Sequence, residues 1–194
     1  MIQSKESITF DLPDADVEFY PNFLTESFSD KIFKELLTET SWRHDDITVF
    51  GKTYKQPRLT ALYSVDGIPY SYSNITMIPE AFTETLNILK TQIEKVTGHD
   101  FTTCLFNLYR DGNDSNGWHA DDEKSLGTNP VIASLSLGAS RNFKLKHRNI
   151  SSAKKVILLT HGSLLIMQGT TQHYWKHHIP KTKKTVGPRI KLTF

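Results

Sequence analysis

The sequence predicts an α+β fold: a double-stranded β-helix (jelly roll) with N-terminal helices covering one face of the sheet. Two observations support this fold class. Helical apolar patterns lie before residue 100, and after Asp100 short apolar segments alternate with turn residues as far as Phe194. Eight short strands behind a helical layer are typical of a jelly roll or a related barrel, whose mouth can hold a metal and a small ligand.

Two helices are expected in the first hundred residues. A helix over about 30–40 has one apolar face, and Ser29 is a suitable N-cap for it. A second helix over about 79–97 has a continuous apolar stripe at helical spacing, with Pro79 in its first turn and Gly98 at its end. The stripe indicates that this helix packs on one face of a sheet.

The remaining segments are expected to be extended. Residues 1–26 predict an irregular arm, and residues 48–52 predict a hairpin with Phe50 near its tip. Tyr70 and Tyr72 lie two positions apart, so they would share one face of a strand. The other expected strands are 57–63, 102–109, 117–121, 131–137, 141–147, 155–159, 163–167, 173–178 and 189–194.

Charge is distributed unevenly along the chain, although the formal net charge of the 194 residues is only +2. Residues 1–123 hold all 21 acidic side chains against 10 basic ones, a balance of −11, whereas residues 124–194 hold 13 basic side chains and no acidic one. A basic face attracts phosphates, so contact with a nucleic acid is one interpretation. Solvated lysines on strand edges are the alternative.

Membrane insertion and disulfide bonding are not expected. The longest apolar stretches, such as residues 156–159, are far too short to span a bilayer. Cys104 is the single cysteine, so it cannot form an internal disulfide, and this suits a reducing compartment. We therefore expect an intracellular protein, cytoplasmic in a prokaryote or nuclear in a eukaryote.

The stretch 118–121 offers the first candidate metal ligands. His119 and Asp121 lie two residues apart with strands on either side, so they can present a nitrogen and a carboxylate oxygen to one ion. A second histidine would complete the ligand set of non-haem iron(II) oxygenases, which leaves three positions open. His161 lies in an apparent turn and suits this role least, and His177 and His178 face opposite ways on a strand, so only one of them can reach the ion. The histidines considered are His147, His161, His173, His177 and His178.

Several ordered motifs resemble one known family. They are residues 107–112, 118–123, 132–138, 161–167, 177–180 and 188–194. Their order and spacing resemble the AlkB family of 2-oxoglutarate- and Fe(II)-dependent dioxygenases over about 45–194, and most closely over 104–194. The branch that repairs alkylated DNA is the most similar. The resemblance implies one dioxygenase domain over 1–194, with N-terminal helices and nucleotide-recognition hairpins at 1–100 and a jelly-roll catalytic core at 101–194.

The resemblance also implies roles for particular residues. Alignment on the Ile-Pro pair after the two adjacent histidines selects His177 as the third ligand of Fe(II), beside His119 and Asp121. The cosubstrate 2-oxoglutarate would be held by Asn107, Tyr109 and Arg189, because a dicarboxylate needs a fixed cation and hydrogen-bond donors. Dioxygen would take an open position on the iron.

Two positions depart from the family pattern. The family usually has Asn where this chain has Lys191, and a second Arg directly after the Thr-Phe pair, where this chain ends at Phe194. Either the chain has been trimmed, or cosubstrate binding is weaker or differently arranged. Lys191 alternates with Arg189 on one strand face, so it is a candidate substitute cation for 2-oxoglutarate.

The implied activity is oxidative demethylation of N-alkylated bases of the 1-methyladenine and 3-methylcytosine type in DNA, with release of formaldehyde and succinate. A base must be flipped out or single-stranded to reach such a pocket. We expect a monomer that acts on DNA, with RNA as the alternative nucleic acid. Two other classes are an AlkB-like dioxygenase acting on RNA or protein, and a catalytically weak nucleic-acid-binding module.

Further residues are candidates for binding the nucleic acid. The base-side candidates are Tyr70, Tyr72, Trp118, Glu123 and Arg58, and the candidate wedge is Phe50. The alternative for Trp118 is core packing beside the metal. The candidate phosphate contacts are Lys144, Lys146, Arg148, Lys181, Lys183 and Lys184.

Overall fold

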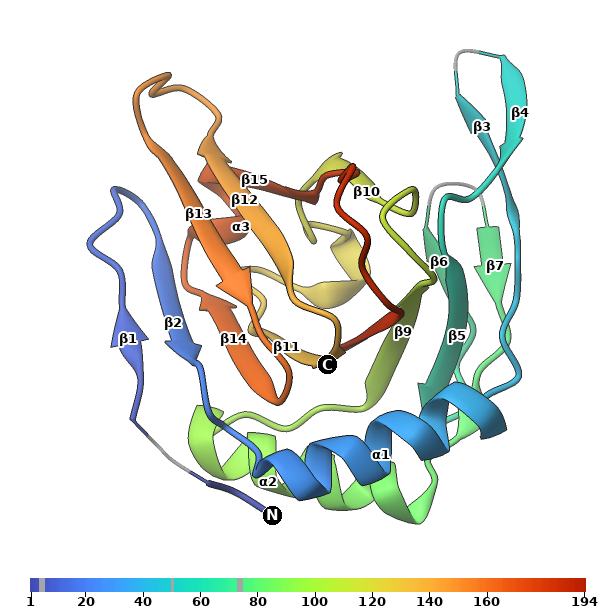
Figure 1. The fold of residues 1–194 in the computed structure, drawn as a ribbon. Coiled ribbons are helices and arrows are strands. Elements are labelled where there is room, and N and C mark those ends of the chain that lie inside the picture. Colours follow the sequence, from blue (N-terminus) through green and yellow to red (C-terminus); the bar gives the residue numbers. More distant parts are fainter. Residues whose placement is uncertain (4–5, 50, 73–74) are drawn as a thin grey trace.

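The computed structural model describes residues 1–3, 6–49, 51–72 and 75–194, and it shows two β-sheets with two long helices beneath the larger one (Figure 1). The larger sheet has eight strands in the order β1-β2-β14-β11-β16-β9-β5-β8. The smaller sheet has four strands in the order β10-β15-β12-β13. None of the helices in the described part of the chain has the length and apolar character needed to span a membrane.

Each element has definite bounds. The larger sheet contains β1 (Ile8–Thr9), β2 (Asp16–Tyr20), β5 (Leu59–Ser64), β8 (Glu80–Ala81), β9 (Thr103–Tyr109), β11 (Ile132–Gly138), β14 (Ser163–Gln168) and β16 (Arg189–Thr193). The smaller sheet contains β10 (Asn116–His119), β12 (Arg141–His147), β13 (Lys154–Leu159) and β15 (Trp175–Ile179). The helices are α1 (Glu26–Glu39), α2 (Glu84–Thr97) and α3 (Thr171–Tyr174), with a 3-10 turn over Lys124–Leu126.

Two apolar layers hold these elements together. The first lies between the helices and the larger sheet, where Ile32 of α1 and Leu89 of α2 pack with Phe106 of β9. The second lies between the two sheets, where Phe143 of β12 and Leu165 of β14 are buried. The predicted fold class is therefore confirmed: two sheets face each other, and the helices cover the outer face of the larger one (Figure 1).

The two helices begin at positions other than those predicted. The first begins at Glu26, directly after its N-cap residue Thr25. Ser29 lies inside this helix and is fully buried, and its backbone N–H donates to the Thr25 carbonyl at 2.9 Å. The second begins at Glu84, because the side chain of Thr83 caps it by accepting a hydrogen bond from Leu86 N. Pro79 therefore precedes β8 and is not part of the helix. The predicted end at Gly98 is confirmed by its left-handed conformation, with a φ of 70°.

The strands after residue 100 lie close to their predicted positions. Two segments differ. The first two residues of the expected strand at 173–178 belong to the short helix α3, and only residues from Trp175 onward pair in β15. The arm over 1–26 contributes β1 and β2 to the larger sheet, because β2 pairs along β14 from Tyr20 to Asp16.

Two hairpins stand apart from the main sheets. The predicted hairpin at 48–52 is confirmed, since β3 (Asp46–Val49) pairs with β4 (Lys52–Lys55) in antiparallel register. Phe50 lies outside the described residues. The second hairpin pairs β6 (Tyr70–Tyr72) with β7 (Ile75–Met77). Its first strand begins at Tyr70 and ends at Tyr72, so both residues lie on one strand, as the sequence predicted.

Candidate metal centre and cosubstrate site

His119, Asp121 and His177 come together between β10 and β15, with candidate ligand atoms that all lie within 4.8 Å of one another. A bulge in β10 makes this possible. Asn116 pairs with Ile179 and His119 pairs with His177. Between these two pairs β10 advances by three residues and β15 by two, so β10 carries one extra residue. The bulge lets both imidazoles point to the same side of the sheet.

The separations of these atoms suit a shared ion better than hydrogen bonds. Asp121 Oδ1 lies 3.6 Å from His119 Nε2, and Asp121 Oδ2 lies 3.6 Å from His177 Nε2. These distances are too long for hydrogen bonds. Two atoms that are each about 2.1 Å from one metal lie about 3–4 Å apart. Asp121 Oδ2 and His177 Nε2 are buried and have no hydrogen-bond partner among the described residues. An ion would give both atoms a partner.

The ionisation of the three side chains also suits a metal. Burial lowers the pKa of His119 and holds that of His177 well below its ordinary value, so both imidazoles are neutral and can donate a lone pair. Burial alone would raise the pKa of Asp121, but electrostatic interactions with His177, Lys191 and His119 lower it. A hydrogen bond from His119 Nδ1 to the Gly117 carbonyl at 2.7 Å fixes Nε2 as the acceptor nitrogen, and the Asn116 amide nitrogen lies 3.2 Å from it.

Asp121 is held in place by a residue from a different segment. Its backbone N–H donates to Gln172 Oε1 at 2.9 Å, and Gln172 is 1% exposed on the short helix α3. The next residue, Asp122, accepts a hydrogen bond from Arg148 Nη2 at 2.8 Å, and Arg148 also donates to the Gln172 carbonyl at 3.3 Å. Arg148 was predicted as a phosphate contact. Its guanidinium instead forms hydrogen bonds with the segment after β10 that carries Asp121 and with the helix α3.

The other histidines considered as ligands have different partners. His147 Nδ1 accepts from the backbone N–H groups of Asn149 and Ile150. His161 Nδ1 accepts from Gly138 N at 2.7 Å, and His173 bonds the Asn129 side chain at 2.8 Å. His178 points to the opposite side of β15 from His177, as the alternation of a strand requires, and stacks on Trp118.

A second group of buried polar side chains lies on β9 and β16. Arg189 pairs with Tyr109, and Lys191 pairs with Asn107, so all four side chains share one face of the larger sheet. Each is at most 4% exposed. That face looks toward the smaller sheet, because the alternating residues Leu108 and Ile190 pack under the helices.

This group contains donors without acceptors. Arg189 Nη2 donates to Ser136 Oγ at 2.9 Å, whereas its Nε and Nη1 and the Tyr109 hydroxyl have no partner among the described residues. Burial lowers the pKa of Arg189 to about 10, so the guanidinium is still charged at neutral pH. A buried guanidinium with two unpaired nitrogens fits a carboxylate ligand, which can accept from both.

Asn107 and Lys191 complete the polar face. Asn107 Oδ1 accepts from Arg58 Nε at 2.7 Å, and Arg58 is only 8% exposed. Arg58, predicted at the base edge, thus lies beside Asn107 and orients its amide. Lys191 is fully buried near Asp121 and Arg189, and burial lowers its pKa to about 8. Lys191 is therefore a cation between the metal ligands and Arg189.

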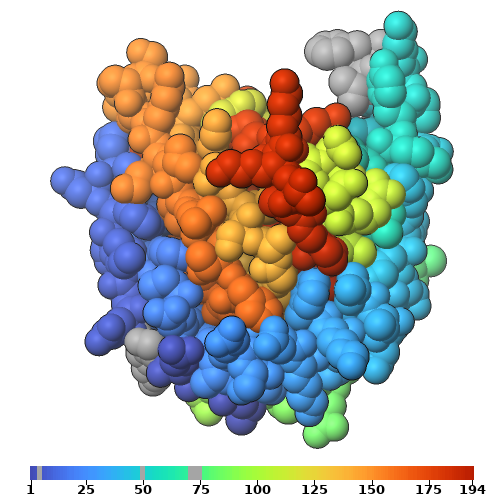
Figure 2. Space-filling model, viewed as in Figure 1, coloured from blue at the N-terminus to red at the C-terminus, as the bar shows by residue number. Residues whose placement is uncertain are grey.

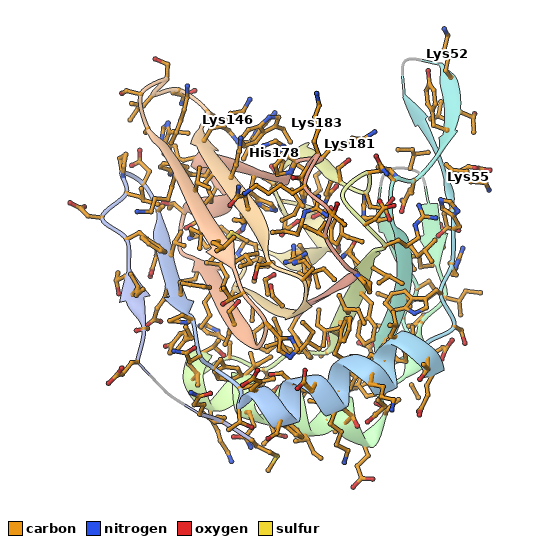
Figure 3. The ribbon with its side chains drawn as sticks, viewed as in Figure 1. Lys52, Lys55, Lys146, His178, Lys181 and Lys183 are labelled. Atoms are coloured by element: carbon orange, nitrogen blue, oxygen red, sulfur yellow. The ribbon has the colours of Figure 1, made fainter. Side chains whose placement is uncertain are left out.

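The remaining candidates lie outside this interior. Trp118 is 39% exposed, which contradicts core packing, and the ammonium of Lys146 lies 4.3 Å from the centre of its ring. The stretch after β15 presents Lys181 and Lys183 at the surface near His178 and Lys146, opposite the hairpin that carries Lys52 and Lys55 (Figure 3). Lys144 is half-buried, Lys184 is exposed, and Glu123 is half-buried before the 3-10 turn.

Some residues of the site have no signal in the sequence. Gln172 lies in a four-residue helix whose contact with Asp121 spans 51 positions. Ser136 alternates with apolar residues on β11 and looks like an ordinary strand residue until Arg189 is placed beside it.

Comparisons with known proteins agree with this geometry. The family model of the 2OG-Fe(II) oxygenase superfamily matches residues 16–194 of this chain. A bovine protein named alpha-ketoglutarate-dependent dioxygenase alkB homolog 3 is 44% identical over 183 residues, which cover 90% of this chain and 63% of that protein. A mouse protein named DNA oxidative demethylase ALKBH2 is 37% identical, with 86% and 74% covered. The solved structure of OsALKBH1 has a TM-score of 0.68 at 17% identity and covers 97% of this chain and 99% of its own, so it supports the fold.

The sheets, the His119–Asp121–His177 triad and the sequence match together place the chain in the 2OG-Fe(II) oxygenase superfamily. Within that superfamily the chain belongs to the AlkB family. The cofactors of such an enzyme are Fe(II), 2-oxoglutarate and dioxygen. The chain spans about 63% of the length of the bovine relative, and 64% of the human one.

Proposed function

We propose that the protein is an oxidative demethylase that repairs N-alkylated bases, of the 1-methyladenine and 3-methylcytosine type, in DNA. The observation that carries the proposal is the cluster of His119, Asp121 and buried His177 beside the unpaired donors of Tyr109 and Arg189. Relatives named as dioxygenases and DNA oxidative demethylases support the substrate class. The protein would act as a monomer.

Each residue has a distinct task in this proposal. His119, Asp121 and His177 would hold Fe(II), and Arg189, Tyr109, Asn107 and Lys191 would hold 2-oxoglutarate. The loaded metal would supply the oxidising chemistry that converts an N-methyl group to a hydroxymethyl group, which then leaves as formaldehyde. The chain would supply positions and charges: Arg189 would bind one carboxylate of the cosubstrate, and Arg58 holds Asn107 in its orientation.

The base would approach from the surface side of His119. Trp118 precedes that ligand and is exposed, and Tyr70 and Tyr72 belong to β6 of a separate hairpin, so aromatic residues are available to the bases of an opened strand. Glu123 lies two residues after the ligand Asp121 and would face the base edge. Phe50, the candidate wedge, stays a prediction. Phosphates would be bound by Lys144, Lys146, Lys181, Lys183 and Lys184.

Formaldehyde release tests this function. Wild-type protein with Fe(II), 2-oxoglutarate and a methylated oligonucleotide should release one formaldehyde for each methyl group lost, from DNA and RNA strands assayed side by side. Release from a methylated peptide and from neither nucleic acid would contradict the proposal. Binding of the oligonucleotide without any release would favour the nucleic-acid-binding module.

A further inference from the structure

The outer face of the smaller sheet holds three lysines in one row. Strand register places Lys146 of β12 opposite Lys154 of β13 on one side and Lys176 of β15 on the other. Like charges directly opposite each other on neighbouring strands are destabilising. None of the three forms an ion pair with a carboxylate in the described part of the chain, and the sequence has no acidic residue after position 123.

A basic cavity accompanies this row. It has a volume of about 500 Å³ and is lined by Lys146, Lys154 and Lys176 together with His147, Arg148 and Ser151. Arg148 is already paired with Asp122, so the three lysines are the cations left to meet a ligand. Three ammonium groups around a solvent-filled hollow suit an anion with several oxygens.

An exposed aromatic stack lies directly beside the row. The rings of Trp118 and His178 are 3.8 Å apart with an interplanar angle of 21°, and the Lys146 ammonium lies 4.3 Å from the Trp118 ring centre. Figure 3 shows Lys146 and His178 close together at the same end of the molecule as Lys181 and Lys183. We call Trp118, His178, Lys146, Lys154 and Lys176 the Trp118 platform.

The composition of the platform matches the two parts of a nucleotide. An indole ring backed by a stacked imidazole offers a flat surface on which a base can stack. The Lys146 ammonium sits on a flexible four-carbon stem, so it can leave the ring and meet a phosphate when a base arrives. Bases of a duplex are already stacked on one another, and therefore only an unpaired base can use this surface.

The position of the platform connects it with the metal centre. Trp118 precedes the ligand His119 and His178 follows the ligand His177, so the two strands that carry the ligands also carry the stack. A strand whose target base enters the metal pocket would continue across the adjacent outer surface. Figure 2 shows the segments that lack acidic residues, in orange and red, gathered over the middle of the viewed face.

We propose that the Trp118 platform binds the single-stranded nucleotides that flank the target base, with one unpaired base stacked on Trp118 and the phosphates held by Lys146, Lys154 and Lys176. The proposal rests on the proposed function in taking a nucleic acid as the ligand. It adds a site and a preference: the protein should bind unpaired strands more tightly than duplexes, through residues that touch neither the iron nor 2-oxoglutarate.

Direct binding is the first test, and the probe is an unmethylated strand of about ten thymidines. Binding should quench tryptophan fluorescence, and Trp118→Ala should abolish the quenching and weaken binding by about five-fold to 150-fold. The double variant Lys154→Ala/Lys176→Ala should weaken binding and reduce the slope of log K against log salt by about 1.4. The control Lys31→Ala/Lys34→Ala, on exposed positions of α1, should change neither quantity.

Turnover is the second test, and it separates this proposal from the proposed function. Lys154→Ala/Lys176→Ala should raise the KM for a long methylated single strand several-fold and leave kcat unchanged, while a methylated trinucleotide is processed as by the wild type. If the wild type demethylates but the variants bind and turn over long strands normally, the proposed binding role of the platform is contradicted and the proposed demethylase function is supported. If single strands bind at the platform but no demethylation occurs, the function is wrong and the platform stands.

A duplex control completes the test. Duplexes of the same sequence should bind more weakly than the single strand and should not quench Trp118. Three results together would overturn the proposal: duplex and single strand bind with equal affinity, Lys154→Ala/Lys176→Ala loses the same affinity for both, and neither quenches Trp118. The row of lysines would then bind phosphates without distinguishing unpaired from paired bases.

Discussion

Gln172 is expected to position a metal ligand without touching the metal. Its side-chain oxygen accepts a hydrogen bond from the backbone N–H of Asp121 at 2.9 Å, and its amide nitrogen donates to the sulfur of Met167 at 3.7 Å. The substitution Gln172→Met preserves the length and volume of this buried side chain and removes the acceptor. The Asp121 N–H then has no partner, and the carboxylate is free to rotate away from His119 and His177.

Two magnitudes follow from this geometry. An unsatisfied part-buried N–H should lower the free energy of unfolding of the metal-free protein by about 1–3 kcal/mol. Loss of a group that orients a ligand typically weakens metal binding by about 10- to 100-fold. At a metal concentration of about 100 times the wild-type Kd, the metal adds about 2.7 kcal/mol to wild-type stability, and a site weakened tenfold would keep about 1.4 kcal/mol of it.

The assay is titration with Co(II), combined with urea unfolding in the presence and absence of the metal. The matched control is Gln168→Met, which replaces a half-buried glutamine whose side chain donates to Asp16 Oδ2 at 2.9 Å instead of contacting the Asp121 backbone. The control should bind Co(II) as the wild type does. A Co(II) Kd for Gln172→Met within two-fold of the wild type would refute the positioning role, even if the variant were less stable.

Three further outcomes are expected. Lys191→Ala should weaken 2-oxoglutarate binding by roughly tenfold or more, measured by calorimetry with Mn(II), because it removes a buried cation; an unchanged Kd would exclude a role for Lys191. Burial alone would raise the pKa of Asp114, but hydrogen bonds from Arg110 hold it below its ordinary value. Asp114→Asn should therefore be less stable than the wild type by about 1–2 kcal/mol at pH 7. The difference should begin to shrink below about pH 4, where the carboxyl of the unfolded chain takes up a proton, and should be lost when the native carboxylate, with its lower pKa, is protonated too; a difference independent of pH in chemical unfolding would contradict this. Lys183→Ala/Lys184→Ala should weaken DNA binding and flatten its salt dependence, and an unchanged salt slope would count against both lysines.

Local patterns were sufficient to predict most of the strands and the end of α2 from the sequence. Turn residues bound the strands after residue 100, and a glycine in the left-handed conformation ends the helix. The start of α1 could not be placed, because Ser29 and Thr25 are both plausible caps. Tertiary packing decides between them: the Ser29 side chain is buried close to Gly162, where an added Cβ would approach the Ser29 hydroxyl to 2.6 Å.

The metal triad was accessible from the sequence only with the help of family resemblance. Spacing alone left five histidines as candidates for the third ligand, and strand alternation reduced the adjacent pair to one. The bulge in β10 that aligns His119 with His177 has no sequence signal. The contacts of Gln172, Ser136 and Arg148 were not predicted, because each joins segments that are distant in the chain.

The most direct test of the proposed demethylase is one paired measurement. Wild-type protein and His119→Ala are incubated with Fe(II), 2-oxoglutarate and a single strand containing one 1-methyladenine, and formaldehyde and succinate are counted together. The account predicts equal amounts of both products from the wild type, no turnover by His119→Ala, and similar binding of the strand by both proteins. Succinate without formaldehyde from the wild type, or formaldehyde from His119→Ala, would contradict it.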